Sequence, residues 1–526
     1  MPKILVADSI AEEGLRLLRR EDGFQVDVRL GLNEDALVEA IPAYDGLLVR
    51  SAVKVTARVL QAGRNLKIVG RAGIGVDNID VEAATRCGVL VMNTPFGNVS
   101  SAAEHTLALL FASARNIARA DRLLREKRWE RNALTGVELA GKTLGIVGAG
   151  KVGSQVARVA KALEMRVLAF DPFLTREKAE EMGLELVTFD ALIEQADFVT
   201  IHTPLTDKTR DMFGPSEFKR MRKGARVINC ARGGIVNEKA LVEALSSKQI
   251  AGAALDVFEK EPLGEHPLLA LDNVTLTPHL GASTEEAQLK VSVDVARQCI
   301  DFFKRGLIQN SVNVVGLGDP QLAPFVALAE LLGTLAGTLA GGAVLRVEVT
   351  CLGELASRDT RAVTVAALRG VLVPVCGDRV NLVNARVIAQ ERGIATLESR
   401  STEARDYISL VTVHVETEGG RRTVSGTLRE RKDPRIVRID GFEVDLKPSA
   451  NMIVMFYPDR PGMVGKFGTI TGKANINIAR MEVGRAERGQ QAVVILTVDD
   501  PVPPAILDEL KAATGGQDVH LVTLRE

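Results

Sequence analysis

The chain has 526 residues, more than one hydrophobic core normally organises, so we expect three or four domains. Hydrophobic residues make up 46% and charged residues 25%, as in ordinary globular proteins, and the net charge of −1 offers no basic surplus for nucleic acid. The five cysteines have no CxxC spacing, which favours reduced thiols in the cytoplasm and predicts no metal site. The start, MPKILVADS, does not have the pattern of a signal peptide.

The first 95 residues alternate short β-runs with helical stretches. The β-runs are KILVA, GLLV, LKIVG and VLVMN. Strands that alternate with helices predict an open parallel sheet with helices on both faces. Residues 99–128 then have the pattern of one long amphipathic helix, whose small residues indicate a subunit interface.

A second series of β-runs begins at Lys142. Its six runs are TLGIVGAG, RVLAFD, FVTIHT, RVINCA, AGAALDV and VTLTPH. Six runs separated by helices describe a complete doubly wound domain. A helix predicted from Ser283 to Phe303 then leads the chain back toward the first sheet.

The C-terminal part has a different pattern. VGLGDP, residues 315–320, is typical of a glycine-rich linker. Residues 321–448 combine one helical stretch with β-runs. The apolar segment 331–345 falls short of the roughly 20 residues that span a membrane, so it predicts a packing helix. From Asn451 the pattern is β–α–β–β–α–β, typical of a ferredoxin-like unit.

The stretch GIVGAGKVG predicts a dinucleotide site. Gly148, Gly150 and Gly153 form a GxGxxG pattern between a strand and a helix, and Asp171 ends the next strand. Glycines let the backbone approach a pyrophosphate at a helix N-terminus, which favours anions. A carboxylate at Asp171 accepts hydrogen bonds from ribose hydroxyls and repels a 2′-phosphate. The pattern therefore predicts NAD rather than NADP.

Three side chains of complementary chemistry follow later strands of the same predicted sheet. Arg232 can bind a substrate carboxylate with two hydrogen bonds, and His279 can take the hydroxyl proton of a 2-hydroxy acid as hydride leaves. Glu261 can pair with the imidazole and fix its tautomer. Taken singly, His279 is also explained as a helix cap and Arg232 as part of a surface ion pair. Their convergence at the carboxyl ends of strands favours a hydride-transfer site.

Several motifs now resemble a known family. GAGKVG with FDP, HTPL, NCARGGIVNE, ALDVFEKEP and TPHLGAST are similar to motifs of the D-isomer-specific 2-hydroxyacid dehydrogenases. Nearly the whole chain resembles the long members of that family, which have an intervening domain and a C-terminal ACT domain. The resemblance implies an α/β fold in which a Rossmann-type doubly wound cofactor domain is inserted in a flavodoxin-like substrate domain, followed by an α+β intervening domain and a ferredoxin-like ACT domain. The expected boundaries are 1–97 and 283–315 for the substrate domain, 98–282 for the cofactor domain, 320–448 for the intervening domain and 449–526 for the ACT domain.

The resemblance also implies the roles of individual residues. Arg232, Glu261 and His279 would be catalytic. The implied dinucleotide contacts are Gly148, Gly150, Lys151, Val152, Gly153, Asp171, Thr203, Cys230, Ala231, Arg232, Asp256, His279, Gly281 and Ala282. Some members have a threonine near the nicotinamide where this chain has Ile74, which puts a side-chain hydrogen bond there in doubt.

A phosphorylated substrate needs cations on the opposite wall of the cleft. Arg50 ends a predicted strand, and Arg71 lies in the loop GRAGIGVDN, whose backbone amides can add an anion nest. Asn98 lies where the chain crosses between domains and is a further candidate to bind substrate. Arg131 is a weaker candidate, which would reach a neighbouring subunit's site. Each arginine singly is equally explained as a solvated surface charge. The resemblance favours phosphate binding and implies NAD-dependent oxidation of 3-phospho-D-glycerate to 3-phosphooxypyruvate, at the start of phosphorylated serine synthesis.

The sequence is also compatible with two other functions. One is a dehydrogenase for an unphosphorylated acid such as glycerate or glycolate. The other is a binding protein that uses NAD only as a signal, because dehydrogenase-like corepressors resemble this fold and can keep the catalytic triad.

The ACT-like segment predicts a regulatory site. The loop after Tyr457 offers helix N-terminal amides to a carboxylate, while Asp459 and Asn477 can bind an ammonium and a hydroxyl. If the enzyme starts serine synthesis, L-serine is the expected effector, and a unit that only dimerises is the alternative. The resemblance implies a homotetramer, and we expect no nucleic-acid or membrane partner. The basic segment 429–438 is explained as an anion site or, preferably, as a solvated hairpin face.

Overall fold

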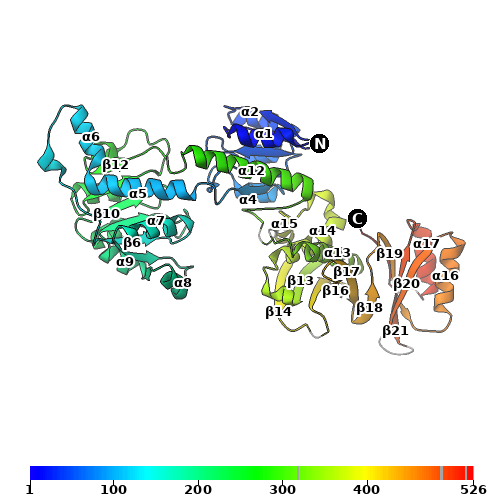
Figure 1. The fold of residues 1–526 in the computed structure, drawn as a ribbon. Coiled ribbons are helices and arrows are strands. Elements are labelled where there is room, and N and C mark those ends of the chain that lie inside the picture. The colour runs from blue at the N-terminus through cyan, green and yellow to red at the C-terminus, as the bar shows by residue number, and fades with distance from the viewer. Residues whose placement is uncertain (315, 317–318, 405, 486–489, 516–517, 525–526) are drawn as a thin grey trace.

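The computed structural model describes residues 1–314, 316, 319–404, 406–485, 490–515 and 518–524. Within these residues the chain forms four β-sheets, each with its own helices (Figure 1). Half of the predicted linker at 315–320, namely residues 315, 317 and 318, lies outside the described residues. The predicted domain boundaries stay predictions, but the sheets divide the chain in the same order.

The N-terminal sheet is parallel, with the strand order β2-β1-β3-β4-β5. Its strands are β1 (Lys3–Val6), β2 (Gln25–Val28), β3 (Gly46–Val49), β4 (Ile68–Arg71) and β5 (Leu90–Asn93), with helices α1 (Glu12–Arg20), α2 (Glu34–Ala40), α3 (Ala57–Ala62) and α4 (Val81–Arg86). The long helix α12 (Glu285–Arg305) returns from the second sheet and packs against α1 and β4 (Figure 1). This order confirms the flavodoxin-like prediction. Strand β2 is not among the predicted β-runs, because QVDV is short and half polar.

The second sheet is also parallel, with the order β12-β11-β10-β9-β6-β7-β8. Its strands are β6 (Thr143–Val147), β7 (Arg166–Phe170), β8 (Glu185–Leu186), β9 (Phe198–Ile201), β10 (Arg226–Asn229), β11 (Gly252–Leu255) and β12 (Val274–Leu276). Its further helices are α7 (Lys151–Ala162), α8 (Arg176–Glu181), α9 (Phe189–Gln195), α10 (Pro215–Arg220) and α11 (Glu238–Ser246). The order confirms the Rossmann-type prediction and adds β8 at one edge. Because the winding reverses between β6 and β9, the crevice at their carboxyl ends is the expected ligand site.

The predicted helix over 99–128 is wrong as a single element. The structure has α5 (Val99–Arg115) and α6 (Ile117–Arg125), separated by Asn116 at φ 55°. Asparagine tolerates this left-handed conformation, and the Asn116 amide donates to Leu134 O at 3.3 Å, near the 3-10 turn Arg131–Leu134. The break directs α6 away from the sheet as an arm whose Trp129 is exposed.

The third sheet, residues 344–446, has the order β14-β13-β15-β16-β17-β18. Its strands are β13 (Val344–Gly353), β14 (Ala395–Ser401), β15 (Ser409–Thr417), β16 (Gly420–Arg429), β17 (Asp433–Ile439) and β18 (Phe442–Leu446). The expectation of one helix here is wrong, since the described residues of this segment form three: α13 (Ala323–Ala340), α14 (Arg361–Cys376) and α15 (Ala385–Glu391). Helix α14 was missed because its many valines and its Pro374 are not typical of helices.

Helix α13 is long and apolar enough by length and composition to cross a membrane. In the fold it packs against α14 and the third sheet, and Leu328, Leu332 and Leu335 are buried there. These contacts agree with the predicted packing helix.

The C-terminal sheet has the order β20-β21-β19-β22 and confirms the ferredoxin-like prediction. Its strands are β19 (Asn451–Pro458), β20 (Ile478–Arg485), β21 (Gln491–Val498) and β22 (Val519–Thr523), with helices α16 (Met463–Lys473) and α17 (Pro504–Ala513). One face of the sheet packs on these two helices. The other face buries Val454 and Phe456 in the core of the third sheet, so the two C-terminal units form a continuous core.

Candidate active site

The glycine loop between β6 and α7 has the backbone that a dinucleotide site requires. Gly148 has φ 93°, and a Cβ there would lie 2.9 Å from His202 O. A Cβ at Gly153 would clash with Gly148 O, so only glycine fits where helix and loop cross. Gly150 is the N-cap of α7, whose first amides therefore point into the loop.

Asp171 lies directly after β7 and is bound to the same loop. One carboxylate oxygen accepts from Ala149 N at 2.9 Å, and the other accepts from Phe173 N at 2.9 Å. The carboxylate is therefore held at the end of the glycine loop, where the ribose hydroxyls of a dinucleotide are expected.

A cleft of about 390 Å³ lies between the N-terminal sheet and the second sheet, which we call the cofactor sheet. Among the predicted site residues, its walls contain Arg50, Arg71, Asn98, Lys151, Val152, Thr203, Cys230, Ala231, Arg232, Asp256, His279, Gly281 and Ala282. The three loop glycines and Asp171 lie outside it, and Glu261 lies behind His279. Arg131 does not line this cleft.

His279 and Glu261 form the predicted pair. The Nδ1 atom of His279 lies 2.7 Å from Glu261 Oε2, and the other oxygen of Glu261 accepts from Phe258 N at 3.0 Å. The hydrogen bond to Glu261 raises the pKa of His279, against the opposing effect of burial. Because Nδ1 is engaged by the carboxylate, Nε2 is the nitrogen left for a substrate proton.

Asp256 holds the turn that presents His279. Its carboxylate is buried and accepts hydrogen bonds from Thr277 Oγ1 at 2.6 Å and from Gly281 N at 2.8 Å. His105, on α5, approaches it at 3.1 Å. The backbone of His279 adopts φ 55°, a strained conformation for a residue other than glycine. The hydrogen bonds to Asp256 therefore stabilise this uncommon backbone turn.

Arg232 lies at the carboxyl end of β10 and reaches across the cleft. Its Nε donates to Asp77 Oδ2 at 2.9 Å, and Nη1 donates to Ala231 O at 2.7 Å. Gly75 leaves room for the guanidinium, since a Cβ there would clash with Nη2. Asp77 is not among the predicted site residues, although it lies in the predicted anion-binding loop GRAGIGVDN.

The opposite wall carries the two arginines predicted to bind phosphate. Asn78 contacts both residues, because its Oδ1 accepts from Arg71 Nε at 2.8 Å and its Nδ2 donates to the backbone oxygen of Arg50 at 2.7 Å. Burial and the positive charge of Arg232 lower the pKa of Arg71 to about 10, so it stays protonated at neutral pH. Three converging guanidinium groups favour an anionic ligand.

Two buried polar atoms in the cleft have no partner within the described part of the chain. They are Thr203 Oγ1 and Asn98 Oδ1. Buried polar groups are normally hydrogen-bonded, so these atoms indicate a ligand that completes their bonding. Together with the glycine loop, they fit a dinucleotide that extends from Asp171 into the cleft.

Two other titratable groups line the cleft but are unsuited to acid–base work there. Burial lowers the pKa of His202 to about 4, and its Nε2 lies 3.0 Å from Thr200 Oγ1. Burial also raises the pKa of Cys230 to about 12, so its thiol stays protonated. His279 is therefore the side chain in this cleft best suited to exchange a proton near neutral pH.

The predicted effector residues do not come together within one chain. Asp459 N donates to Gln490 O, whereas the Asn477 amide donates to Asp499 at 2.6 Å. Gln490 and Asp499 flank β21, so the two positions are about 30 Å apart at the usual strand rise. Tyr457 is buried, with its ring against Phe467.

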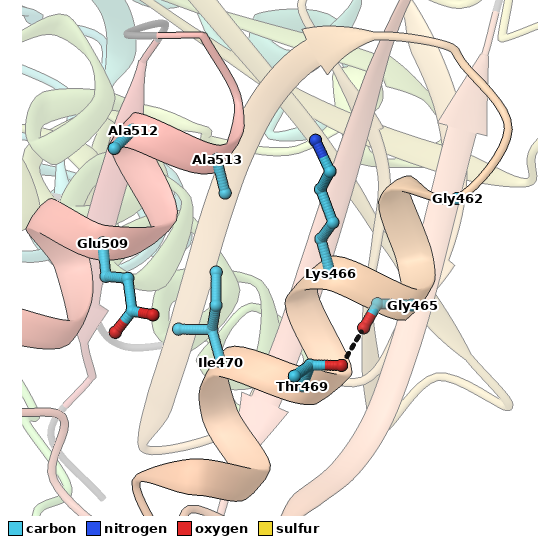
Figure 2. A pocket seen from close by; sticks show the side chains of 8 residues that line it. All are labelled: Gly462, Gly465, Lys466, Thr469, Ile470, Glu509, Ala512 and Ala513. Carbon is cyan, nitrogen blue, oxygen red and sulfur yellow. Dashed lines mark hydrogen bonds between the residues drawn. The ribbon is translucent and has the colours of Figure 1, made fainter.

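The same unit has a hollow between α16 and α17, and none of the three predicted effector residues lines it. Figure 2 shows its lining, which consists of Gly462, Gly465, Lys466, Thr469, Ile470, Glu509, Ala512 and Ala513. Most of these side chains are small, and Lys466 and Glu509 supply one charge of each sign.

Models of protein families match the chain in three places. The D-isomer specific 2-hydroxyacid dehydrogenase, NAD binding domain, matches residues 107–281. The D-3-phosphoglycerate dehydrogenase intervening domain matches residues 321–440, and the ACT domain matches residues 451–515. A NAD-dependent formate dehydrogenase from Staphylococcus aureus, solved in complex with NAD, is 29% identical with a TM-score of 0.55 and covers 60% of this chain and 100% of its own. The fold and site thus define a D-isomer specific 2-hydroxyacid dehydrogenase, and the predictions of that class and of an NAD-binding domain are confirmed.

Full-length relatives narrow this class. The D-3-phosphoglycerate dehydrogenase of Synechocystis sp. is 45% identical over 100% of this chain and 95% of its own, and that of Archaeoglobus fulgidus is 44% identical over 99% and 100%. The corresponding protein of Bacillus subtilis is 40% identical over the full length of both chains. The chain belongs to the D-3-phosphoglycerate dehydrogenase family.

Proposed function

We propose that the protein oxidises 3-phospho-D-glycerate to 3-phosphooxypyruvate with NAD, as the first step of phosphorylated L-serine synthesis. The observation that carries the proposal is the distribution of charge in the cleft. Arg50 and Arg71 lie on one wall, and Arg232 lies beside His279 on the other. A substrate with a phosphate at one end and a carboxylate at the other complements these two groups.

These positions support a specific role for each site residue. Arg232 gives up its hydrogen bond to Asp77 and binds the substrate carboxylate with two hydrogen bonds. The hydroxyl then faces His279, whose neutral imidazole takes the proton at Nε2 while Glu261 stabilises the resulting cation. NAD, when bound, supplies the acceptor for the hydride. The binding energy of the phosphate orients the reacting carbon and excludes water.

Enzyme assays distinguish this proposal from its alternatives. NADH absorbance should rise when 3-phospho-D-glycerate and NAD are added at alkaline pH, which draws the unfavourable oxidation forward. D-glycerate and glycolate should give much lower kcat/KM. A higher kcat/KM for either unphosphorylated acid would favour the first alternative, and no reaction with any of the three would favour a binding protein that senses NAD.

Replacing Glu261 by glutamine should move the pH dependence of the reaction. The hydrogen bond to the Glu261 carboxylate raises the pKa of His279, and oxidation requires the neutral imidazole, so activity falls as the pH drops through that raised pKa. Without the charge the pKa falls, and the acid limb of the kcat/KM profile should shift to lower pH. A profile that keeps its position while only the rate drops would contradict the pairing.

Replacing Asp171 by serine should weaken NAD binding about tenfold or more and reduce discrimination against NADP, since charged hydrogen bonds to the ribose are lost. Asp171→Asn is the matched control, because it keeps an oxygen that can accept from Ala149 N. Dissociation constants for both dinucleotides, measured by fluorescence titration, test this. Unchanged preference in both variants would mean that another residue contacts the ribose.

We also propose L-serine as a feedback inhibitor that binds between two ACT units. A two-fold axis perpendicular to α16 would bring the Asp459 end of one chain beside the Asn477 end of its partner. Such a pair would supply the ammonium and hydroxyl ligands that lie about 30 Å apart in one chain. Serine must bind one quaternary state better than the other for inhibition to follow.

Asp459→Ala and Asn477→Ala should each abolish inhibition by millimolar serine and leave uninhibited turnover unchanged. Hybrids assembled from the two variants should regain part of the inhibition, because one of their two shared sites has both ligands intact. Hybrids that stay insensitive would contradict a shared site. A wild-type protein that ignores serine would remove the regulatory proposal altogether.

The proposed assembly is a homotetramer in the cytoplasm. Support comes from the exposed arm around α6, with Trp129 and Leu124 on its surface, and from the ACT unit. The five cysteines are free thiols, as expected in a reducing compartment. Light scattering that finds a monomer at micromolar concentration would contradict the assembly.

A further inference from the structure

A second large cavity, of about 1170 Å³, lies where the N-terminal sheet meets the intervening domain. On one side its wall comes from the turn before β4, the end of α4 and the start of β5. On the other side it comes from α14, the 3-10 turn Gly377–Arg379 and α15. This junction cavity shares no lining residue with the active-site cleft.

A hydrogen bond and close packing hold the two walls of the junction cavity together. The Asn381 amide donates to Gly88 O at 2.8 Å across the junction. Gly88 has φ 73°, and a Cβ there would lie 2.6 Å from Asn381 Nδ2 and 2.8 Å from Asn384 Nδ2. Val383 packs against the core of the N-terminal sheet. The cavity is therefore bounded by a close-fitting contact between the two units.

The lining of the junction cavity is strongly cationic. Its basic side chains are Arg64, Lys67, Arg86, Arg369 and Arg379. Among the described lining side chains, the only carboxylate is Asp45, which lies 3.3 Å from Lys67. Lys67, Arg86 and Arg369 each have a carboxylate partner, namely Asp45, Glu82 and Glu330. Within the described part of the chain, the cations of the lining that remain without a counter-charge are Arg64 from the N-terminal unit and Arg379 from the intervening domain.

Several of these cations have donors to spare. Within the described part of the chain, the guanidinium groups of Arg64 and Arg379 have no hydrogen bond or ion pair. Arg369 is paired with Glu330, yet its Nε is buried without a partner. A buried donor that lacks an acceptor indicates an unfilled hydrogen-bonding position.

We propose that the junction cavity binds a small polyanion, with phosphate or carboxylate groups, that bridges the two units. One anionic group would meet Arg64 from the N-terminal sheet and another would meet Arg379 and Arg369 from the intervening domain. Strand β4 begins at Ile68, directly after Lys67 of the cavity, and ends at Arg71 in the active-site cleft. The ligand would therefore sit at the opposite end of a strand that carries an arginine of the active-site cleft.

Calorimetric titration of the full-length protein with pyrophosphate, and separately with citrate, tests this proposal. The wild type should show a binding step that the double variant Arg64→Ala/Arg379→Ala weakens about tenfold or more. Arg386→Ala is the matched control, since this exposed arginine of α15 does not line the cavity. Preference for pyrophosphate or for citrate would distinguish phosphate from carboxylate as the natural group.

Anion binding in the junction cavity should be independent of anion binding in the active-site cleft. Arg71→Ala weakens anion binding in the cleft and should leave the junction step intact, while the junction variant should keep wild-type kcat because neither of its arginines touches the cleft. Binding of both probes that is lost in Arg71→Ala and retained in the junction variant would overturn the proposal. So would the absence of any binding in the wild type at low ionic strength, where such attraction is strongest.

Discussion

Replacing His279 by alanine should lower kcat for 3-phospho-D-glycerate oxidation by about 10²- to 10⁴-fold, the usual contribution of general acid–base catalysis. The imidazole is the group in the cleft whose pKa and position suit proton transfer, since the hydrogen bond to Glu261 raises that pKa and leaves Nε2 for substrate. Steady-state kinetics and an NADH titration measure the effect. NADH affinity should change little.

His202→Ala is a useful comparison for this variant. His202 also lines the cleft, but burial lowers its pKa to about 4 and Thr200 Oγ1 lies 3.0 Å from its Nε2. Its loss should affect folding or cofactor binding rather than the pH dependence of turnover. A His279→Ala variant with near-normal turnover would reject the assignment of the base.

Replacing Arg71 by alanine should lower kcat/KM for 3-phospho-D-glycerate by about 10²-fold, because two charge-assisted hydrogen bonds to phosphate are lost. Its Nε is engaged by Asn78, so the two Nη atoms are the donors left for a ligand. The slow reaction of D-glycerate, which has no phosphate, should be nearly unchanged. The variant would thus remove the preference for the phosphorylated acid.

Asn78→Ala tests the same wall indirectly. It removes the acceptor of Arg71 and a donor to Arg50 O without removing a charge. We expect KM for 3-phospho-D-glycerate to rise with a smaller loss than in Arg71→Ala, because the arginines remain but are less well oriented. Equal losses for both acids in Arg71→Ala would contradict phosphate binding at this wall.

The sequence could predict those parts of the site that depend on strand ends. Gly148, Arg232 and His279 each follow a strand of the cofactor sheet, and parallel strands bring their carboxyl ends to one edge. Asp77 and Asn78 were not assigned, because their roles depend on how a loop of one sheet meets the other sheet. The residue pattern within the loop does not show which residues of the other sheet it contacts.

Other differences have equally local causes. A single left-handed residue, Asn116, divides the predicted helix over 99–128, and hydrophobic periodicity does not register one backbone torsion. Helix α14 is rich in valine, a residue that favours strands, and packing against α13 overrides that preference. The distance between Asp459 and Asn477 follows from their contacts at opposite ends of β21, and a sequence motif does not show which residues pair with that strand.

A crystal structure of the His279→Ala variant with NAD and 3-phospho-D-glycerate would show directly how the substrate lies between the two walls of the cleft. We expect the phosphate against Arg50 and Arg71, the carboxylate against Arg232, and the hydroxyl directed at the space left by the imidazole. A substrate bound in the reverse direction, or with its phosphate outside the cleft, would contradict it.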